Sequence, residues 1–136
     1  MSKVILTVDD SMTIRQMVGF VLKNAGYTVV SAVDGIDGLN KAKSQHVDLI
    51  LTDLNMPNMD GLVLTQSLRT ETNYATTPIF MMTTESDDEK KTAGQQAGVT
   101  GWIVKPFNPD QLLKVIEQAL NSEKSATATV TELATG

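Results

Sequence analysis

The sequence predicts an α/β domain in which a doubly wound parallel sheet lies between two layers of helices. Two observations support this fold class. Short apolar runs alternate with longer stretches in which apolar residues recur at helical spacing, and this alternation is typical of strands joined by right-handed helical crossovers. The apolar runs, such as residues 4–8, are also nearly continuous rather than alternating in polarity, as expected for parallel strands covered on both faces. The prediction is therefore a three-layer sandwich.

Five of the apolar runs are interpreted as strands. The predicted strands are residues 4–8, 28–32, 48–52, 78–82 and 101–104. The run at 28–32 is the least apolar of them, which favours an edge position. Pro78 is compatible with the fourth strand because proline is tolerated at the first residue of a strand.

Each run is followed by a stretch that is interpreted as a helix. Gly26 is predicted to end the first helix, and Asp34, Asp60 and Asn108 are predicted N-caps of the second, third and fifth. The fourth helix, residues 86–97, is unusual because it contains no large apolar residue.

The fourth helix therefore has weak anchors. Ala93 and Ala97 are its only apolar contacts with a core, and Gly94 sits inside it, at a cost of about 1 kcal/mol relative to alanine. Weak anchoring predicts that this helix is the most mobile part of the domain.

Composition sets the broad class. The 136 residues are 41% hydrophobic and 20% charged, enough for one domain with a real core. A net charge of −5 argues against a nucleic-acid surface, which needs clustered Lys and Arg. The apolar runs of about five residues are far too short to span a membrane. With no signal-like N-terminus the expected location is cytoplasmic, and without cysteine there is no disulfide or cysteine-bound zinc.

The chain is expected to form one domain, residues 1–121. Residues 122–136 are rich in Ser, Thr and Ala, and we expect a flexible tail there, either native or in part added by cloning.

Polar side chains follow four of the five predicted strands. These residues are Asp9 and Asp10 after the first strand, Asp53 after the third, Thr83 and Thr84 after the fourth, and Lys105 after the fifth. Ligands of open parallel sheets bind beyond the carboxyl ends of the strands, so these side chains are expected to meet. Taken singly, each has an ordinary interpretation: the Asp pair as a helix cap, a threonine as structural, and Lys105 as part of a turn.

Three neighbouring carboxylates need a cation. At a separation of about 5 Å and an effective dielectric constant near 20, each pair repels by about 3 kcal/mol. Oxygen ligands without His or Cys select Mg²⁺ or a similar hard ion, which points to phosphoryl chemistry. Asp53 is then the candidate nucleophile and would form an acyl phosphate. Lys105 and Thr83 are candidates to bind phosphoryl oxygens.

Together these positions resemble the receiver domain of bacterial response regulators, and most of all the single-domain, CheY-like chemotaxis regulators. The resemblance covers about residues 3 to 121 and implies a flavodoxin-like (βα)5 fold with sheet order 2-1-3-4-5. The matching residues are Asp9–Asp10, Asp53 within LTDLNMPNMDG, Thr83 and Lys105–Pro106.

The resemblance also implies a chemistry. Asp53 would accept a phosphoryl group from a histidine kinase. Magnesium would be held by Asp10, Asp53 and the backbone carbonyl of Asn55, with Asp9 acting through water. Pro106 would follow a cis peptide, which is rare in general.

In the family, a switch couples phosphorylation to the hydroxyl matching Thr83 and to an aromatic residue, here Trp102. The family usually has tyrosine or phenylalanine at this position, so the larger indole is expected either to rotate inward incompletely or to require a larger movement of helix 86–97. The alternative is that Trp102 packs on the surface between the last two helices. Thr84 is bulkier than the residue often found there, which would restrict the phosphodonor, and Glu85 would influence the attacking water.

The leading hypothesis is a stand-alone response regulator for chemotaxis. Because no effector domain follows Asn121, output is expected from partner binding through the face formed by residues 86–121. The expected partners are a chemotaxis-type histidine kinase and a flagellar switch protein, another output protein or a phosphatase. The chain is expected to be a monomer, and to be no enzyme beyond its own phosphorylation and dephosphorylation.

Two alternatives stay open. A phosphorelay intermediate would pass the phosphoryl group to a histidine phosphotransfer protein; His46 of this chain is expected in a surface loop and is not such a carrier. A magnesium-dependent phosphohydrolase of the haloacid-dehalogenase type would need Asp-x-Asp after the first strand. Here the aspartates are adjacent, and Ser11 takes the place of the second.

Overall fold

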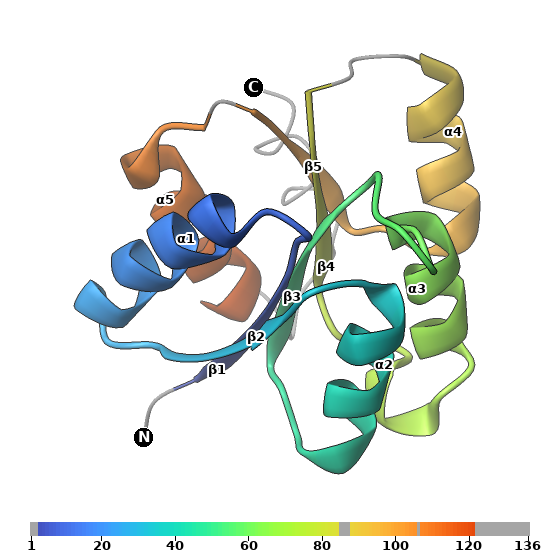
Figure 1. The fold of residues 1–136 in the computed structure, drawn as a ribbon, viewed down its shortest axis with the longest axis horizontal. Coiled ribbons are helices and arrows are strands. Elements are labelled where there is room, and N and C mark those ends of the chain that lie inside the picture. Colours follow the sequence, from blue (N-terminus) through green and yellow to red (C-terminus); the bar gives the residue numbers. More distant parts are fainter. Residues whose placement is uncertain (1–2, 85–87, 106, 122–136) are drawn as a thin grey trace.

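A computed structural model describes residues 3–84, 88–105 and 107–121 of the chain (Figure 1). Strands and helices alternate along it as the sequence predicts. The elements are β1 (Val4–Val8), α1 (Met12–Asn24), β2 (Thr28–Ala32), α2 (Gly35–Ser44), β3 (Leu49–Asp53), α3 (Gly61–Arg69), a 3-10 turn η1 (Thr72–Tyr74), β4 (Ile79–Thr83), α4 (Asp88–Ala97), β5 (Gly101–Val104) and α5 (Pro109–Asn121).

The five strands form one parallel sheet in the order β2-β1-β3-β4-β5, which confirms the predicted fold class and topology. The register aligns the carboxyl ends of the central strands: Val8 pairs with Thr52, and Asp53 pairs with Met82. β2 occupies an edge, as its weaker apolar pattern indicates. The sheet therefore delivers the residues after β1, β3, β4 and β5 to one edge.

Two strands are shifted by one residue relative to the prediction. β3 begins at Leu49 rather than at Asp48, and the carboxylate of Asp48 accepts a hydrogen bond from the backbone N–H of Val4 at 2.8 Å. β4 begins after Pro78. The shift makes Asp53 and Thr83 the last residues of their strands instead of the first residues beyond them.

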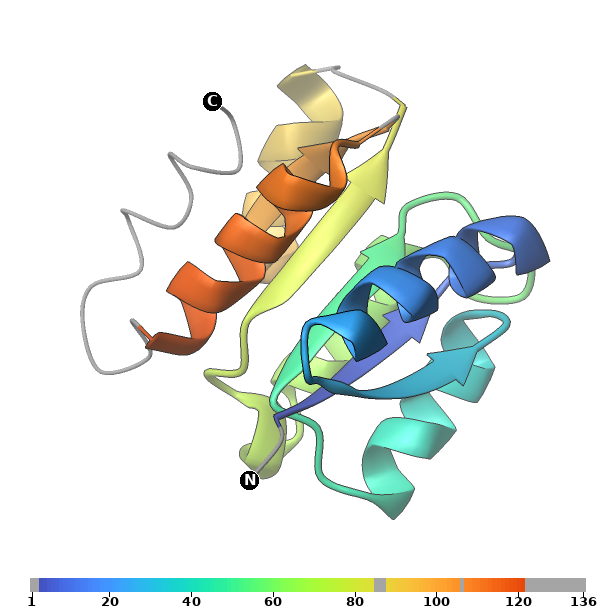
Figure 2. The ribbon, with the colours of Figure 1, turned by 90° about the vertical axis from the view of Figure 1, so that its left-hand side faces the viewer.

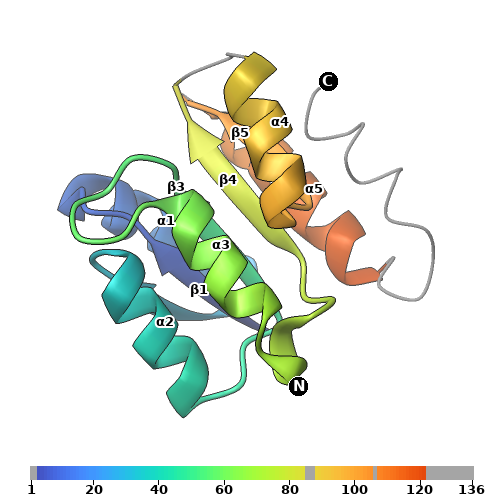
Figure 3. The same cartoon turned by 90° about the vertical axis from the view of Figure 1, so that its right-hand side faces the viewer.

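The helices cover both faces of the sheet. Helices α1 and α5 lie on one face (Figure 2), and α2, α3 and α4 lie side by side on the other (Figure 3). Consecutive strand residues therefore pack in different cores: Ile5 lies in the core beneath α1 and α5, and Leu6 in the core beneath α2 and α3. This is why the strands are apolar at nearly every position.

Helix caps were predicted in part. Asp34 and Asp60 accept hydrogen bonds from the N–H groups of Asp37 and Val63, and so cap α2 and α3. The capping interpretation of the Asp9–Asp10 pair is wrong, because Ser11 caps α1 by accepting from the N–H of Ile14. Both aspartates are thus released from that role.

Three further predictions concern His46, membrane-spanning helices and the C-terminal tail. His46 lies in the loop before β3 and is exposed, with its Nε2 atom 3.1 Å from Oδ1 of Asp48. Among the described residues, none of the helices has the length and apolar character needed to cross a membrane. The expected tail, residues 122–136, lies outside the described residues.

Candidate functional site

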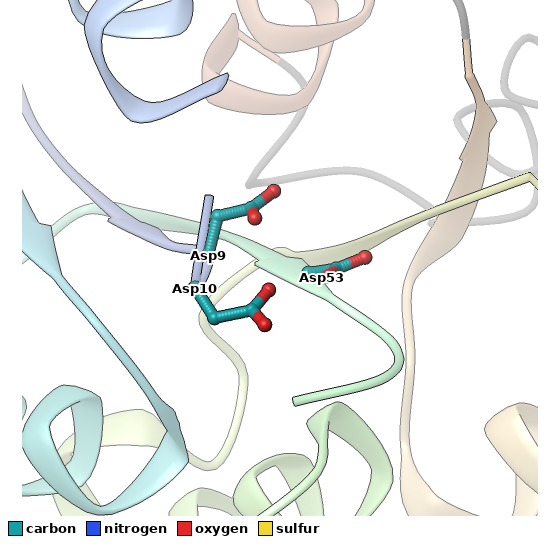
Figure 4. A group of neighbouring side chains, drawn as sticks. All are labelled: Asp9, Asp10 and Asp53. Atoms are coloured by element: carbon teal, nitrogen blue, oxygen red, sulfur yellow. The ribbon is translucent and has the colours of Figure 1, made fainter. Parts of the chain in front are cut away.

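Three carboxylates converge at the carboxyl edge of the sheet. Asp9 and Asp10 follow β1 and Asp53 ends the neighbouring strand β3. One carboxylate oxygen from each residue lies within 4.8 Å of the others, and the three side chains extend in the same direction from the ends of their strands (Figure 4). Their burial differs, because Asp9 is 1% exposed, Asp53 is half-buried and Asp10 is exposed. The site is therefore an acidic pocket open on the Asp10 side.

Lys105 brings a positive charge to this pocket from the far end of the chain. Its Nζ atom lies 3.1 Å from Oδ2 of Asp9 and 3.1 Å from Oδ1 of Asp53. The Lys105 backbone N–H donates to the carbonyl of Thr83 at 2.8 Å, which fixes the start of the loop after β5. The ammonium group therefore bridges two of the three acids.

The surroundings of the pocket shift the pKa values of both Asp53 and Lys105. Burial raises the pKa of Asp53, and the charge of Asp9 raises it further, while Lys105 and the N–H of Leu54 act in the opposite direction without cancelling the rise. For Lys105, burial opposes the charged form, but the hydrogen bonds and charges of Asp53 and Asp9 outweigh it and raise its pKa. The charged form of the Lys105 ammonium is therefore favoured, whereas burial and the charge of Asp9 disfavour the charged form of Asp53.

Asp9 is held rigidly in its place. Its Oδ1 atom accepts a hydrogen bond from the N–H of Ser11 at 2.9 Å, and its backbone carbonyl accepts from Nη1 of Arg15 at 2.6 Å. Its own N–H donates to the carbonyl of Ala32 at 3.1 Å. These contacts fix the position of the Asp9 carboxylate at one side of the pocket.

The loop after Asp53 turns sharply and depends on glycine. A Cβ atom at Gly61 would lie 2.4 Å from the carbonyl oxygen of Asp53 and 2.5 Å from Sδ of Met81. The N–H of Gly61 donates to the carbonyl of Leu54 at 2.9 Å, closing the turn. Asn55 is exposed within this loop; its expected backbone contribution to a metal stays a prediction.

A contact with the β2–α2 loop also holds this segment, and the sequence analysis missed it. Asn58 has a positive φ of 69°, a conformation that asparagine tolerates better than most residues. Its Nδ2 atom donates to Oδ2 of Asp34 at 2.7 Å, and the N–H of Gly35 donates to the carbonyl of Met59 at 3.2 Å. The available signal was an asparagine next to proline in a turn sequence.

The other predicted site residues have mixed outcomes. Thr83 is buried at the end of β4, one residue beyond the strand partner of Asp53, so it lines the same edge of the sheet. Thr84 is exposed after it. Glu85 and Pro106 lie outside the described residues, and their roles stay predictions.

Trp102 is buried, so the surface-packing alternative is wrong. Its side chain is 5% exposed and packs with Leu54 and Met81 in a small core of its own. On the other side it meets Gly94 of α4, where a Cβ atom would lie 2.4 Å from Cζ2 of the indole. The large ring is accommodated because a glycine faces it.

The donor set suits a hard divalent cation of the magnesium type. It consists of carboxylate oxygens, without sulfur or imidazole nitrogen, and such ions prefer oxygen ligands. Burial, and after it the charge of Asp9, raises the pKa of Asp53 at the same place, and a bound cation would favour the charged carboxylate. The residues present therefore fit a bound cation.

The fold and the site together define a class: a small α/β signalling domain with an acidic pocket at the carboxyl edge of a parallel sheet. The chain belongs to the response regulator receiver domain family, whose model matches residues 5–117. This confirms the resemblance seen in the sequence.

The relatives of this chain include both a chemotaxis protein and a transcriptional regulator. A chemotaxis protein CheY homolog of Campylobacter jejuni is 37% identical over 120 residues, which cover 87% of this chain and 92% of that protein. A probable transcriptional regulator, ycf27 of Porphyridium aerugineum, is 37% identical over 124 residues, 91% of this chain but only 50% of its own length. The chain thus spans half of that longer regulator.

Solved structures agree. The Vibrio cholerae chemotaxis protein CheY4 has a TM-score of 0.86 and 47% identity, covering 88% of this chain and 100% of its own. The receiver domain of the sensor histidine kinase PA1611 from Pseudomonas aeruginosa, with a magnesium ion coordinated in its active site cleft, has a TM-score of 0.84 and 28% identity, covering 90% of this chain and 100% of its own.

Proposed function

We propose that this receiver domain is a phosphorylation switch in which Asp53 accepts a phosphoryl group from a histidine kinase. The observation that carries the proposal is the placement of the Lys105 ammonium 3.1 Å from both Asp9 and Asp53, in a pocket with three carboxylates. Of these, Asp53 is accessible enough to react and buried enough to be shielded from water.

The transfer is a simple displacement at phosphorus. A carboxylate oxygen of Asp53 attacks, a P–O bond forms, and the P–N bond to the kinase imidazole breaks; the ring nitrogen keeps the electron pair and is later protonated from solvent. Lys105 neutralises a phosphoryl oxygen and Thr83 donates a hydrogen bond to another. The protein thus contributes mainly positioning and charge.

Magnesium is the proposed cofactor. Asp10, Asp53 and the Asn55 carbonyl would hold it, with Asp9 acting through water, and the ion would supply charge neutralisation to the phosphoryl oxygens. Support comes from the oxygen-only donor set and from the magnesium ion in the structure of the PA1611 receiver domain. Glu85, Thr84 and Pro106 are proposed to adjust water access and the shape of the pocket.

Chemotaxis is the proposed pathway. The support is the similarity to the Campylobacter CheY homolog and to Vibrio CheY4 over nearly their whole lengths. The proposed partners are a chemotaxis-type kinase and a flagellar switch protein, another output protein or a phosphatase, bound through the face formed by α4, β5 and α5.

A phosphorelay role is the second candidate, since the chain also resembles the receiver domain of a sensor histidine kinase. Radiolabelled, phosphorylated chain mixed with histidine phosphotransfer proteins distinguishes the two: transfer of the label supports a relay. Phosphorylation-dependent binding to a flagellar switch component supports chemotaxis. Membership of the receiver family leaves the phosphohydrolase alternative without support.

Mass spectrometry tests the central step. Incubation with acetyl phosphate and Mg²⁺ is expected to add the mass of one phosphoryl group, and chelation of Mg²⁺ with EDTA should prevent this. Asp53→Asn should abolish the gain, whereas the matched control Asp60→Asn, at a helix cap in the same loop, should retain it. A gain in the Asp53→Asn variant would refute the proposal.

A further inference from the structure

The position of α4 requires an explanation, because its sequence offers the sheet almost nothing apolar. The helix reads DEKKTAGQQA, and Ala97 is buried near its end. Arg69 of α3 holds the C-terminal side through Nε and Nη2, which donate to the carbonyl of Gly98 at 3.0 and 2.8 Å. Nearer the middle, a buried glycine, Gly94, takes the position where a core side chain would be expected.

Gly94 is costly in a helix, by about 1 kcal/mol relative to alanine, and the structure shows what it provides. A Cβ atom there would lie 2.4 Å from Cζ2 of Trp102, 3.2 Å from Cε2 and 3.3 Å from Cη2. The first distance is far below van der Waals contact, so no other residue permits the helix backbone to approach the indole this closely. The indole of Trp102 thus supplies the apolar contact between helix and sheet that the apolar side chains of other helices supply.

Residues that pack with the indole of Trp102 also connect it to the acidic pocket. Trp102 shares its small core with Leu54 and Met81. Leu54 directly follows Asp53, and its N–H donates to Oδ1 of Asp53 at 3.0 Å. Packed side chains therefore connect the loop that leaves Asp53 with the backbone of α4.

We propose that Gly94 is a positioning residue. Its lack of a side chain lets the indole of Trp102 pack against the backbone of α4, a contact that we call the seat. Through Trp102 and Leu54, Gly94 also couples the position of α4 to the phosphorylation state of Asp53. The coupling rests on the proposed phosphorylation of Asp53, whereas the seat does not. In this arrangement the ring is already inside, so α4 moves against the indole on phosphorylation and the ring does not rotate in from the surface. Because coupling free energies act in both directions, a substitution at Gly94 that displaces α4 is expected to change the affinity of the Asp53 site for a phosphoryl mimic.

The seat is tested with Gly94→Ala against a matched control, Gly19→Ala. Both glycines are buried in helices, but a Cβ at Gly19 meets nothing within 4 Å. Trp102 is the only tryptophan, so fluorescence reports on the seat directly. Gly94→Ala should red-shift the emission, increase acrylamide quenching and lower the unfolding midpoint, and Gly19→Ala should leave the emission unchanged.

A smaller ring provides the rescue. In a Trp102→Phe background, Gly94→Ala should cost little stability, so the double-mutant cycle, followed by circular dichroism, should be strongly non-additive. If Gly94→Ala alone does not fold, the double variant Gly94→Ala/Trp102→Phe provides the test. A folded double variant supports the seat, and an unfolded one overturns it. Unchanged emission and stability in Gly94→Ala would also overturn it.

The coupling is tested with beryllium fluoride and Mg²⁺ as a phosphoryl mimic. Gly94→Ala should change the half-saturating beryllium fluoride concentration by about twofold to thirtyfold, the range for residues that transmit coupling. Gly19→Ala should not change it, and Trp102→Phe should reduce the effect of Gly94→Ala. If the wild type gains no phosphoryl mass from acetyl phosphate, the proposed function fails while the seat stands on its own test. If the wild type is phosphorylated and Gly94→Ala saturates like it, the coupling fails.

Discussion

Helices α1 and α4 lie on opposite faces of the sheet and are attached to it in different ways. Helix α1 buries Val18 and Leu22 in the larger core, and its buried glycine, Gly19, has open space where a Cβ would be. Helix α4 has no large apolar side chain to bury, and its buried glycine, Gly94, leaves no space for a Cβ beside the indole of Trp102. Several large apolar contacts hold α1 in place, whereas α4 is held by one indole ring, the buried Ala97 and the hydrogen bonds of Arg69 to Gly98, so we expect α4 to move more easily.

The largest expected effect comes from removing the ring. Trp102→Ala should destabilise the domain by about 3–5 kcal/mol, the usual range for a buried aromatic residue, because α4 loses its main support. Truncating Phe20 on α1, which is 68% exposed, should change stability by no more than about 0.5 kcal/mol. Urea denaturation measures both, and equal losses would contradict the comparison.

Leu22→Ala on α1 should cost about 2–5 kcal/mol but act on the whole domain. Hydrogen exchange followed by mass spectrometry should show faster exchange throughout the core, while half-saturation with beryllium fluoride stays as in the wild type. Faster hydrogen exchange confined to α4 would indicate that the positions of α1 and α4 are not maintained independently.

Asp53→Asn should stabilise the protein by about 0.5–2 kcal/mol at neutral pH without Mg²⁺, the range for a substitution that relieves an unfavourable charge. The reason is the buried, like-charged setting that raises the pKa of Asp53. Thermal unfolding should show the gain, and added Mg²⁺ should reduce it by stabilising the wild type more than the variant. A gain that is independent of Mg²⁺ would argue against a cation at this carboxylate.

Gly19→Ala should stabilise the domain by about 0.5–1 kcal/mol, because alanine is the better helix former and the site has room for a methyl group. Gly94→Ala should shift stability in the opposite direction. Finding the same sign for both substitutions, by denaturant titration, would remove the distinction between the two helices.

The smallest expected effect concerns pH and the contact between Asp34 and Asn58. Hydrogen bonds from the N–H of Asp37 and from Asn58 lower the pKa of Asp34 below its ordinary value of 3.8. A lowered folded-state pKa means that the contribution is present above the unfolded-state value and is lost as pH falls through the folded-state value. Asn58→Gly keeps the positive φ and removes one donor. Its difference in unfolding midpoint from the wild type should therefore shrink below about pH 4, and a difference that grows there would contradict this.

Much of the fold and the acidic site was predictable, for a simple geometric reason. Parallel strands end at one edge, so residues that follow different apolar runs, such as Asp9, Asp53 and Lys105, must meet there. Apolar strand patterns come from burial on both faces, which is a property of the sequence itself. Only the strand limits at Asp48 and Pro78 were off, each by one residue.

What could not be predicted depends on distances between separate elements. Asp9, Asp10 and Ser11 are all capable caps, and only the path of the chain selects Ser11. The meeting of Gly94 with Trp102 depends on how closely α4 approaches β5, and no local pattern carries that distance. The sequence raised the question of how an indole, larger than the ring usual in the family, would fit at position 102. The structure shows that Gly94 of α4 provides the space.

The double ion pair of Lys105 has a consequence for biosynthesis. The lysine follows Asp9 by 96 positions and Asp53 by 52, and domains emerge from the ribosome N-terminus first. A nascent chain therefore exposes both acids long before their counter-charge has been made. The ion pairs can therefore form only after β5 and Lys105 have been synthesised, and α5 still has to follow before the domain is complete.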